Sequence, residues 1–186
     1  NHPYMGVRAP GYPLFLGLIY TLFGYNHIAV YLIQIVLDLL IVLMLYSISK
    51  TIFNTKRYAY IVATLWAINP ISIYYTISIL TEILFLFLLV AGLYLFITKI
   101  LYSKGYNYLI LISIIYGFAA LIKPLIMPIY LLLLCAILWK YRKDLQEKLA
   151  RYVLVIGVSI ILFMLISSAF MIRNNYLFDK PINSEL

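Results

Sequence analysis

Residues 28–49 read IAVYLIQIVLDLLIVLMLYSIS, an apolar run that only Gln34 and Asp38 interrupt. A helix that crosses a bilayer needs about 20 predominantly apolar residues in succession. This run has the required length. It therefore predicts a transmembrane helix and sets the fold class of the chain.

The composition of the whole chain also indicates a protein that lies in a membrane. Of the 186 residues, 66% are hydrophobic and 11% are charged, and the mean hydropathy is +1.03. A soluble domain is usually about half apolar and about a quarter charged. The 19 Tyr and two Trp residues suit the membrane–water interfaces, where amphipathic rings collect. We therefore expect an integral membrane protein whose main partner is the lipid bilayer.

Further apolar runs predict five more spans, at residues 58–80, 83–102, 106–122, 125–139 and 152–172. The Asn69-Pro70 pair interrupts the first of these, and proline there should kink the helix or end it early. Residues 12–24 are too short to cross a bilayer, so they predict an interfacial helix. The polar residues 140–151 predict a connector at the surface. The expected fold is an all-α, polytopic transmembrane bundle of about six spans, in one domain over residues 1–186.

The basic residues predict the orientation of this bundle. The formal charge is +8, but the cations lie between apolar runs and not in one patch, so nucleic-acid binding is not expected. Ten lie in loops on one side of the bundle and four on the other: Lys50, Lys56, Arg57, Lys99, Lys104, Lys140, Arg142, Lys143, Lys148 and Arg151 against Arg8, Lys123, Arg173 and Lys180. The positive-inside rule places the first group in the cytoplasm. The expected location is the plasma (inner) membrane of a prokaryote.

The non-cytoplasmic ends of the spans carry the candidate site. Its residues are polar, charged or aromatic: Arg8, Tyr12, Tyr74, Tyr75, Thr81, Glu82, Lys123, Arg173, Asn174 and Asn175. An Arg fork matches phosphate oxygens and a Lys is a point charge, so these cations would suit a lipid-linked phosphate. The alternative is that they anchor the protein to anionic headgroups or snorkel to the interface.

Two carboxylates are notable by their depth in the apolar sequence. Glu82 should have a partner, and pairing with Lys123 or Arg173 and binding of a sugar hydroxyl are equally open. Asp38 falls on one helical stripe with Tyr31 and Gln34, which should face the bundle. A structural hydrogen bond is the favoured role for Asp38, and a functional role is the alternative.

Other chemistry is not indicated. The chain has no Gly-rich phosphate loop, no Cys/His spacing typical of a metal site and no Ser–His–Asp set. The single Cys135 is expected to be a small core residue, and His2 and His27 are expected to be interface residues. No cofactor is predicted, and the metal requirement stays open.

Short motifs follow one another along the chain: RAPGYPLFL at 8–16, Gln34 and Asp38, IFN at 52–54 with KR at 56–57, NP at 69–70, YY at 74–75, TEILF at 81–85, GFAALIKP at 117–124, IRNNY at 172–176 and KP at 180–181. Their order resembles that of family 39-type glycosyltransferases. These are the dolichyl-phosphate-mannose protein mannosyltransferases and the bacterial aminoarabinose transferases, which have the GT-C fold. Each motif is short, but their common order spans essentially the whole chain.

This resemblance implies a membrane transferase that uses a polyprenyl-phosphate-linked sugar. It also implies that the short helix after Arg8 borders the active site. The family's acidic catalytic motif precedes the segment equivalent to residues 8–16, so the catalytic carboxylate is expected upstream of Asn1. We therefore expect a fragment that is inactive alone.

The leading hypothesis is inverting sugar transfer on the outer membrane face. Arg8, Lys123 or Arg173 would stabilise the leaving phosphate, and Tyr12, Tyr74 and Tyr75 would shape the sugar pocket. The sugar and the acceptor (protein, lipid or wall polymer) stay open. The alternative is a transporter or flippase subunit for a lipid-linked intermediate, in which Asp38 would relay protons. A membrane scaffold without chemistry is the third possibility.

Overall fold

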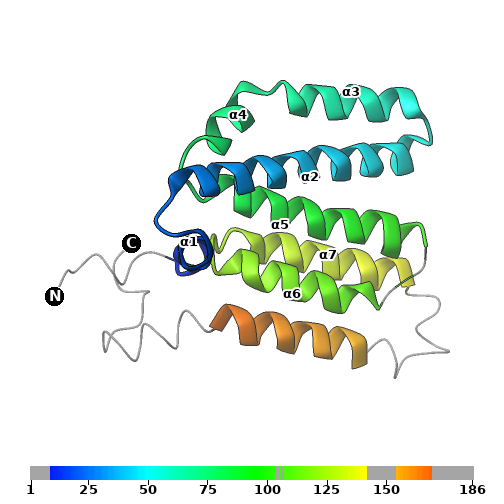
Figure 1. The fold of residues 1–186 in the computed structure, drawn as a ribbon. Helices are drawn as coiled ribbons and strands as arrows, with labels where there is room; N and C mark the ends of the chain where they lie inside the picture. The colour runs from blue at the N-terminus through cyan, green and yellow to red at the C-terminus, as the bar shows by residue number, and fades with distance from the viewer. Residues whose placement is uncertain (1–8, 104, 106, 142–153, 169–186) are drawn as a thin grey trace.

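The computed structural model describes residues 9–103, 105, 107–141 and 154–168. The described residues form helices joined by short turns, and no strand occurs among them. The long helices lie side by side, and the chain passes back and forth between the two ends of the bundle (Figure 1). This arrangement confirms the expected all-α class.

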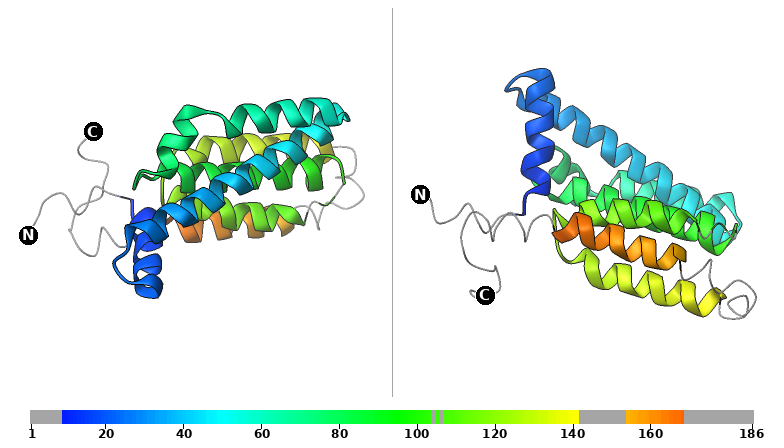
Figure 2. Two further views of the ribbon diagram at one scale, coloured as in Figure 1. Left: turned by 45° about the horizontal axis from the view of Figure 1, so that its top comes forward. Right: turned by 90° about the horizontal axis from the view of Figure 1, so that it is seen from below.

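The first two helices meet at a sharp corner. Helix α1 (Gly11–Phe23) lies across one end of the bundle (Figure 2), and α2 (His27–Phe53) runs along the length of the bundle. Gly24 turns the chain between them with a φ of 71°, in the left-handed region that favours glycine. The Asn26 side chain then accepts a hydrogen bond of 2.9 Å from the Ile28 amide and caps α2.

The predicted span at residues 58–80 is two helices. Helix α3 (Lys56–Ala67) ends before Asn69, and α4 (Pro70–Thr76) begins at the proline. Proline has no amide hydrogen and so suits the first turn of a helix. The Asn69 side chain accepts a hydrogen bond of 3.0 Å from the Ile71 amide. The expected break at Asn69-Pro70 is confirmed.

The chain then crosses the bundle repeatedly through α5 (Glu82–Leu95), the π-helix η1 (Phe96–Leu101), α6 (Tyr108–Ala120) and α7 (Ile126–Tyr141). A last described helix spans Leu154–Ser168. The predicted connector at 140–151 lies outside the described residues, apart from Lys140 and Tyr141, which end α7. Lys140 Nζ donates hydrogen bonds to the carbonyls of Ile100 and Leu101 and so ties α7 to η1.

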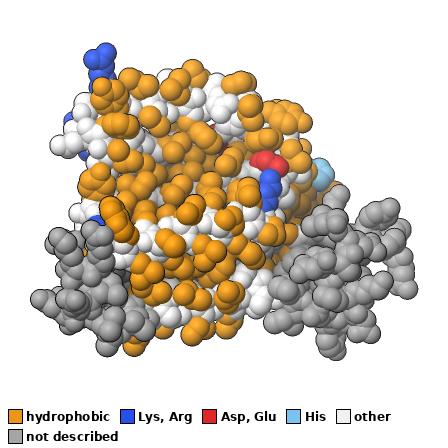
Figure 3. Space-filling model, turned by 180° about the vertical axis from the view of Figure 1, so that it is seen from behind, with side chains coloured by type: hydrophobic (Ala, Val, Ile, Leu, Met, Phe, Trp, Pro, Cys, Tyr) orange, Lys and Arg blue, Asp and Glu red, His pale blue; other side chains and the backbone are white. Residues whose placement is uncertain are grey.

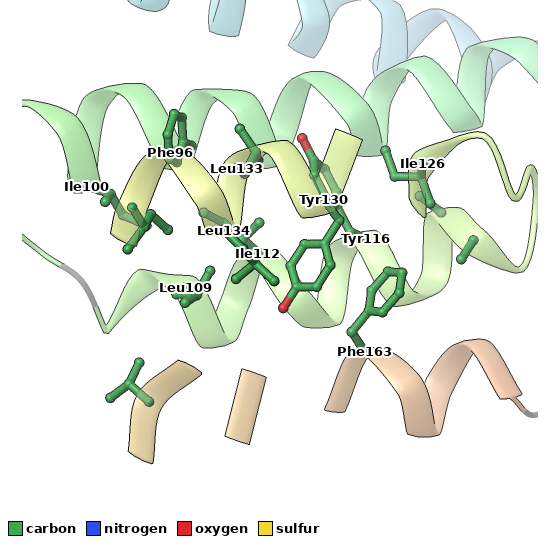
Figure 4. Packing of buried hydrophobic residues seen from close by; sticks show 14 of the residues in the cluster. Phe96, Ile100, Leu109, Ile112, Tyr116, Ile126, Tyr130, Leu133, Leu134 and Phe163 are labelled. Carbon is green, nitrogen blue, oxygen red and sulfur yellow. The ribbon is translucent and has the colours of Figure 1, made fainter. Parts of the chain in front are cut away.

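The core lies between α5, α6, α7 and the last helix. The rings of Tyr130 and Phe163 stack with centroids 4.4 Å apart, and the hydroxyls of Ser113 and Tyr130 share a buried hydrogen bond of 2.8 Å. Figure 4 shows how these rings meet the aliphatic side chains around them. These contacts join α6, α7 and the last helix.

Two described helices are long and apolar enough to cross a membrane, His27–Phe53 and Glu82–Leu101, with mean hydropathies of 2.7 and 2.5. Only 17% of the apolar window of the first is buried inside the protein. A helix in the core of a soluble protein would be mostly buried, whereas lipid solvates exposed apolar side chains. Gly11–Phe23, Tyr108–Ala120, Ile126–Tyr141 and Leu154–Ser168 are shorter, so the count of six spans stays a prediction.

Candidate functional site

The start of α1 packs against the turn between α6 and α7. The Gly11 amide donates a hydrogen bond of 2.8 Å to the Leu121 carbonyl. A Cβ added at Gly11 would lie 2.7 Å from Ile122 Cγ1 and 2.8 Å from that carbonyl oxygen, so glycine allows the close approach. The segments 9–16 and 117–124, over 100 residues apart in the sequence, thus meet at one end of the bundle.

Gln34 links α1 to the segment before α5. Its side chain is fully buried, and its Nε2 lies 3.2 Å from the Ser78 carbonyl oxygen, 3.5 Å from that of Leu80 and 3.5 Å from the Tyr12 hydroxyl. The Ser78–Leu80 segment is not helical. The Ser78 carbonyl accepts a hydrogen bond of 2.9 Å from the Leu80 amide, and the Gln34 amide is a further donor from α2 to the Ser78 and Leu80 carbonyls. The Gln34 side chain of α2 therefore contacts both α1 and the segment before α5.

Glu82 and Lys123 form an ion pair across the ends of α5 and α6. Lys123 Nζ lies 2.8 Å from Glu82 Oε1, and the side chains are 35% and 26% exposed. Thr81 Oγ1 donates a hydrogen bond of 3.3 Å to Glu82 Oε2, and the Lys123 ammonium lies 5.7 Å from the centroid of the Phe85 ring. Of the partners left open for Glu82, the structure places Lys123 in contact with it.

Helix dipoles favour the position of both charges. Glu82 begins α5, where the amide groups carry partial positive charge, and Lys123 follows the last turn of α6, where the carbonyls carry partial negative charge. Figure 3 shows an acidic and a basic side chain in contact on a face that is otherwise largely hydrophobic. The pair is therefore a local polar spot beside apolar surface, where a molecule with a charged head and an apolar tail could lie.

The three candidate tyrosines differ in their surroundings. Tyr12 is buried, Tyr75 is half-buried and Tyr74 is 59% exposed. Tyr74 and Tyr75 lie in α4 with ring centroids 5.9 Å apart. Burial raises the pKa of the Tyr12 phenol to about 12. This hydroxyl therefore stays protonated at neutral pH and can donate as well as accept a hydrogen bond.

Asp38 lies one helical turn beyond Gln34 and bonds to both α3 and α4. Its Oδ1 accepts hydrogen bonds from Trp66 Nε1 at 2.9 Å and from Ser72 Oγ at 2.6 Å. These donors lie on either side of the Asn69-Pro70 break, in α3 and α4. Asp38 therefore joins the two halves of the interrupted span, which is the structural role that the sequence favoured.

The remaining candidates lie outside the described residues: Arg8, Arg173, Asn174 and Asn175. Within the described residues, no group of three His, Cys, Asp or Glu side chains could hold a metal ion. A shallow apolar hollow of about 420 Å³ lies beside α6, lined by Asn107, Tyr108, Ile110, Leu111 and Ile114. These residues occupy the half of α6 farther from Lys123, so the hollow is not part of the candidate site.

Sequence reasoning missed two contacts of this site. It did not identify Gly11 as a packing contact or Gln34 as a link to the Ser78–Leu80 segment. The glycine within RAPGYP was a visible signal of close backbone approach, and a lone amide in an apolar span was a signal of a buried partner.

Comparison with known proteins gives a family for the chain. A family model described as dolichyl-phosphate-mannose-protein mannosyltransferase matches residues 1–167. No curated protein and no solved structure matches the chain.

Proposed function

The chain belongs to the dolichyl-phosphate-mannose-protein mannosyltransferase family, and we propose that it transfers a sugar from a polyprenyl-phosphate-linked donor to an acceptor hydroxyl on the non-cytoplasmic face. The membership makes it a membrane glycosyltransferase of the mannosyltransferase-like type. The donor, the acceptor and the membrane face are the parts that we propose.

The observation that carries this proposal is the Glu82–Lys123 pair at the end of the bundle where α1 packs. The Lys123 ammonium has three N–H donors, and its bond to Glu82 uses one of them. The others can meet phosphate oxygens while the carboxylate holds the side chain in place. The hydrophobic faces of the neighbouring helices provide a surface for the polyprenyl chain.

In the proposed reaction, the acceptor oxygen attacks the anomeric carbon and the bond from that carbon to the phosphate oxygen breaks. The electron pair leaves with the polyprenyl phosphate, and a base takes the proton of the acceptor hydroxyl. Lys123, together with Arg8 and Arg173, would stabilise the charge that develops on the leaving phosphate. Asn174 would contribute a neutral hydrogen-bonding group.

The base is not assigned to either described carboxylate. Glu82 is bound to Lys123, and Asp38 accepts hydrogen bonds from two side chains in the bundle. Tyr12, Tyr74 and Tyr75 are proposed to shape the sugar pocket, because phenol rings combine an apolar face with a hydroxyl. The contacts of Asp38 with Trp66 and Ser72 account for this residue without proton relay, and nothing in the family match supports the transporter alternative.

The test is an assay of the full protein in bilayers with a polyprenyl-phosphate-linked sugar. We expect Lys123→Met to lower kcat/KM by about 100-fold or more, as loss of one donor to a developing oxyanion does. Arg8→Ala and Arg173→Ala should also lower it. The control is Lys56→Met, because Lys56 is exposed at the opposite end of the bundle. Wild-type turnover in all three site variants would refute the proposed phosphate contact.

A further inference from the structure

Gln34 is a side chain of the candidate site to which the proposed reaction gives no role. It is fully buried, so it cannot touch a substrate directly. It lies in α2, between α1 on one side and the turn before α5 on the other. Its single amide nitrogen faces three acceptors, of which the Ser78 carbonyl is nearest at 3.2 Å.

The orientation of the amide follows from these neighbours. If the amide were flipped, its oxygen would face the Ser78 and Leu80 carbonyl oxygens, and neither of those groups can donate a hydrogen bond. In the observed orientation Nε2 serves the loop, while Oε1 is buried without a hydrogen-bond partner among the described residues. An unsatisfied buried acceptor is costly, so the contribution of this amide to the site comes from its Nε2 donor.

We propose that Gln34 is a positioning residue of the transferase. Its amide holds Tyr12 of α1 and the Ser78–Leu80 segment at a fixed separation, and so fixes the place of the Glu82–Lys123 pair relative to α1. Glu82 follows Leu80 by two residues, and only Thr81 lies between them. A displaced loop would therefore move the carboxylate that holds Lys123. The kinetic part of this inference rests on the proposed function, whereas the structural part does not.

The side-chain chemistry makes glutamine specific at this position. Glutamate has nearly the same size but has no N–H group, and its ionised carboxylate only accepts hydrogen bonds, so its oxygens would face the loop carbonyls. Leucine removes the side-chain donor altogether, so among the described residues the Ser78 carbonyl keeps only its bond from the Leu80 amide and the Leu80 carbonyl loses its contact with α2. Both substitutions therefore remove the link, one with and one without a charge.

The first experiment measures the separation of α1 and the loop directly. Spin labels are attached at Leu14 and Ile77, which are 66% and 58% exposed, in the full protein with Cys135→Ser. We expect one narrow distance distribution with Gln34 and a broader or shifted one with Gln34→Glu and with Gln34→Leu. Tyr12→Phe, which removes only the α1 end of the link, should broaden it less. An unchanged distribution in all three variants would overturn the proposal.

The second experiment separates positioning from general stability. Ser113→Ala is the matched control, because it also removes a buried side-chain hydrogen bond, between α6 and α7. Each variant is assayed at the same interval below its own melting temperature, so that differences in stability do not enter the comparison. Gln34→Glu should lower kcat by about 10-fold or more, since small misplacements of catalytic groups are that costly, with the donor KM changed by less than about threefold. Ser113→Ala should stay within about threefold of the wild-type kcat.

An equal loss of kcat in Ser113→Ala and Gln34→Glu would also overturn the positioning role. The two failures can be told apart. If Lys123 variants transfer sugar normally, the proposed function fails, whereas the label distances still report on Gln34 because they need no turnover.

Discussion

The Gly11 amide and the Leu121 carbonyl oxygen are 2.8 Å apart and join α1 to the end of α6. This hydrogen bond connects backbone to backbone, so no side-chain substitution removes it directly. It places α1 next to Ile122 and Lys123, and hence beside the ion pair. The position of α1 is thus set by how closely two stretches of backbone approach.

Gly11→Ala should displace α1 and lower activity. The added Cβ would lie 2.8 Å from the Leu121 carbonyl oxygen, which is backbone and cannot rotate away. Overpacking of this kind costs about 1–3 kcal/mol, and we expect a lower melting temperature together with reduced sugar transfer. The control is Gly17→Ala in the same helix, where a Cβ would meet nothing within 4 Å. Equal behaviour of the two variants would contradict the observed packing.

The Glu82–Lys123 pair should couple only modestly in stability. Both side chains are partly exposed, so a double-mutant cycle of Glu82→Gln and Lys123→Met should give about 0.5–1 kcal/mol. The exchanged pair, Glu82→Lys with Lys123→Glu, keeps the attraction but opposes both helix dipoles. We therefore expect the exchanged protein to fold with slightly lower stability than wild type and to lack transferase activity. Full activity in the exchanged protein would argue against a specific role for the Lys123 cation.

How much of this arrangement the sequence predicted depends on the kind of contact. The break at Asn69-Pro70 was predictable because proline lacks an amide hydrogen. The polar stripe of Gln34 and Asp38 was also expected to face the bundle. The Gln34 side chain does bond to the segment before α5, and Asp38 bonds to α3 and α4. These features follow from local chemistry and helical periodicity.

Tertiary contacts were less accessible from the sequence. Nothing local distinguishes Lys123 from other candidate partners of Glu82, because that pairing depends on α5 and α6 being neighbours. The π-helix Phe96–Leu101 contains no proline or glycine from which it could be predicted. It is stabilised by residues far away in the sequence, Lys140 and Tyr141, whose side chains donate hydrogen bonds to its carbonyls.

Asp38→Asn should leave stability almost unchanged, because the amide oxygen still accepts from Trp66 and Ser72. Asp38→Leu leaves both donors without this acceptor and should cost about 1–3 kcal/mol. The comparison is Thr51→Val in the same helix, whose hydroxyl bonds, within the described part of the chain, to the Ser47 carbonyl of α2 alone. Melting temperatures of the purified variants in detergent provide the measurement. A large loss in Asp38→Asn would indicate that the charge of the carboxylate matters, and would revive a functional role for it.

The orientation of the bundle can be tested with single cysteines. In the Cys135→Ser protein, Tyr25→Cys lies at the α1–α2 corner and Tyr102→Cys follows η1 at the other end, and the native side chains are 81% and 58% exposed. The described cations Lys50, Lys56, Arg57, Lys99 and Lys140 lie toward the Tyr102 end, so the positive-inside rule predicts that this end is cytoplasmic. A membrane-impermeant thiol reagent applied to intact cells should label Tyr25→Cys at once, and Tyr102→Cys only after the membrane is permeabilised. The reverse pattern would place Lys123 on the cytoplasmic side and would remove the proposed site from the outer face.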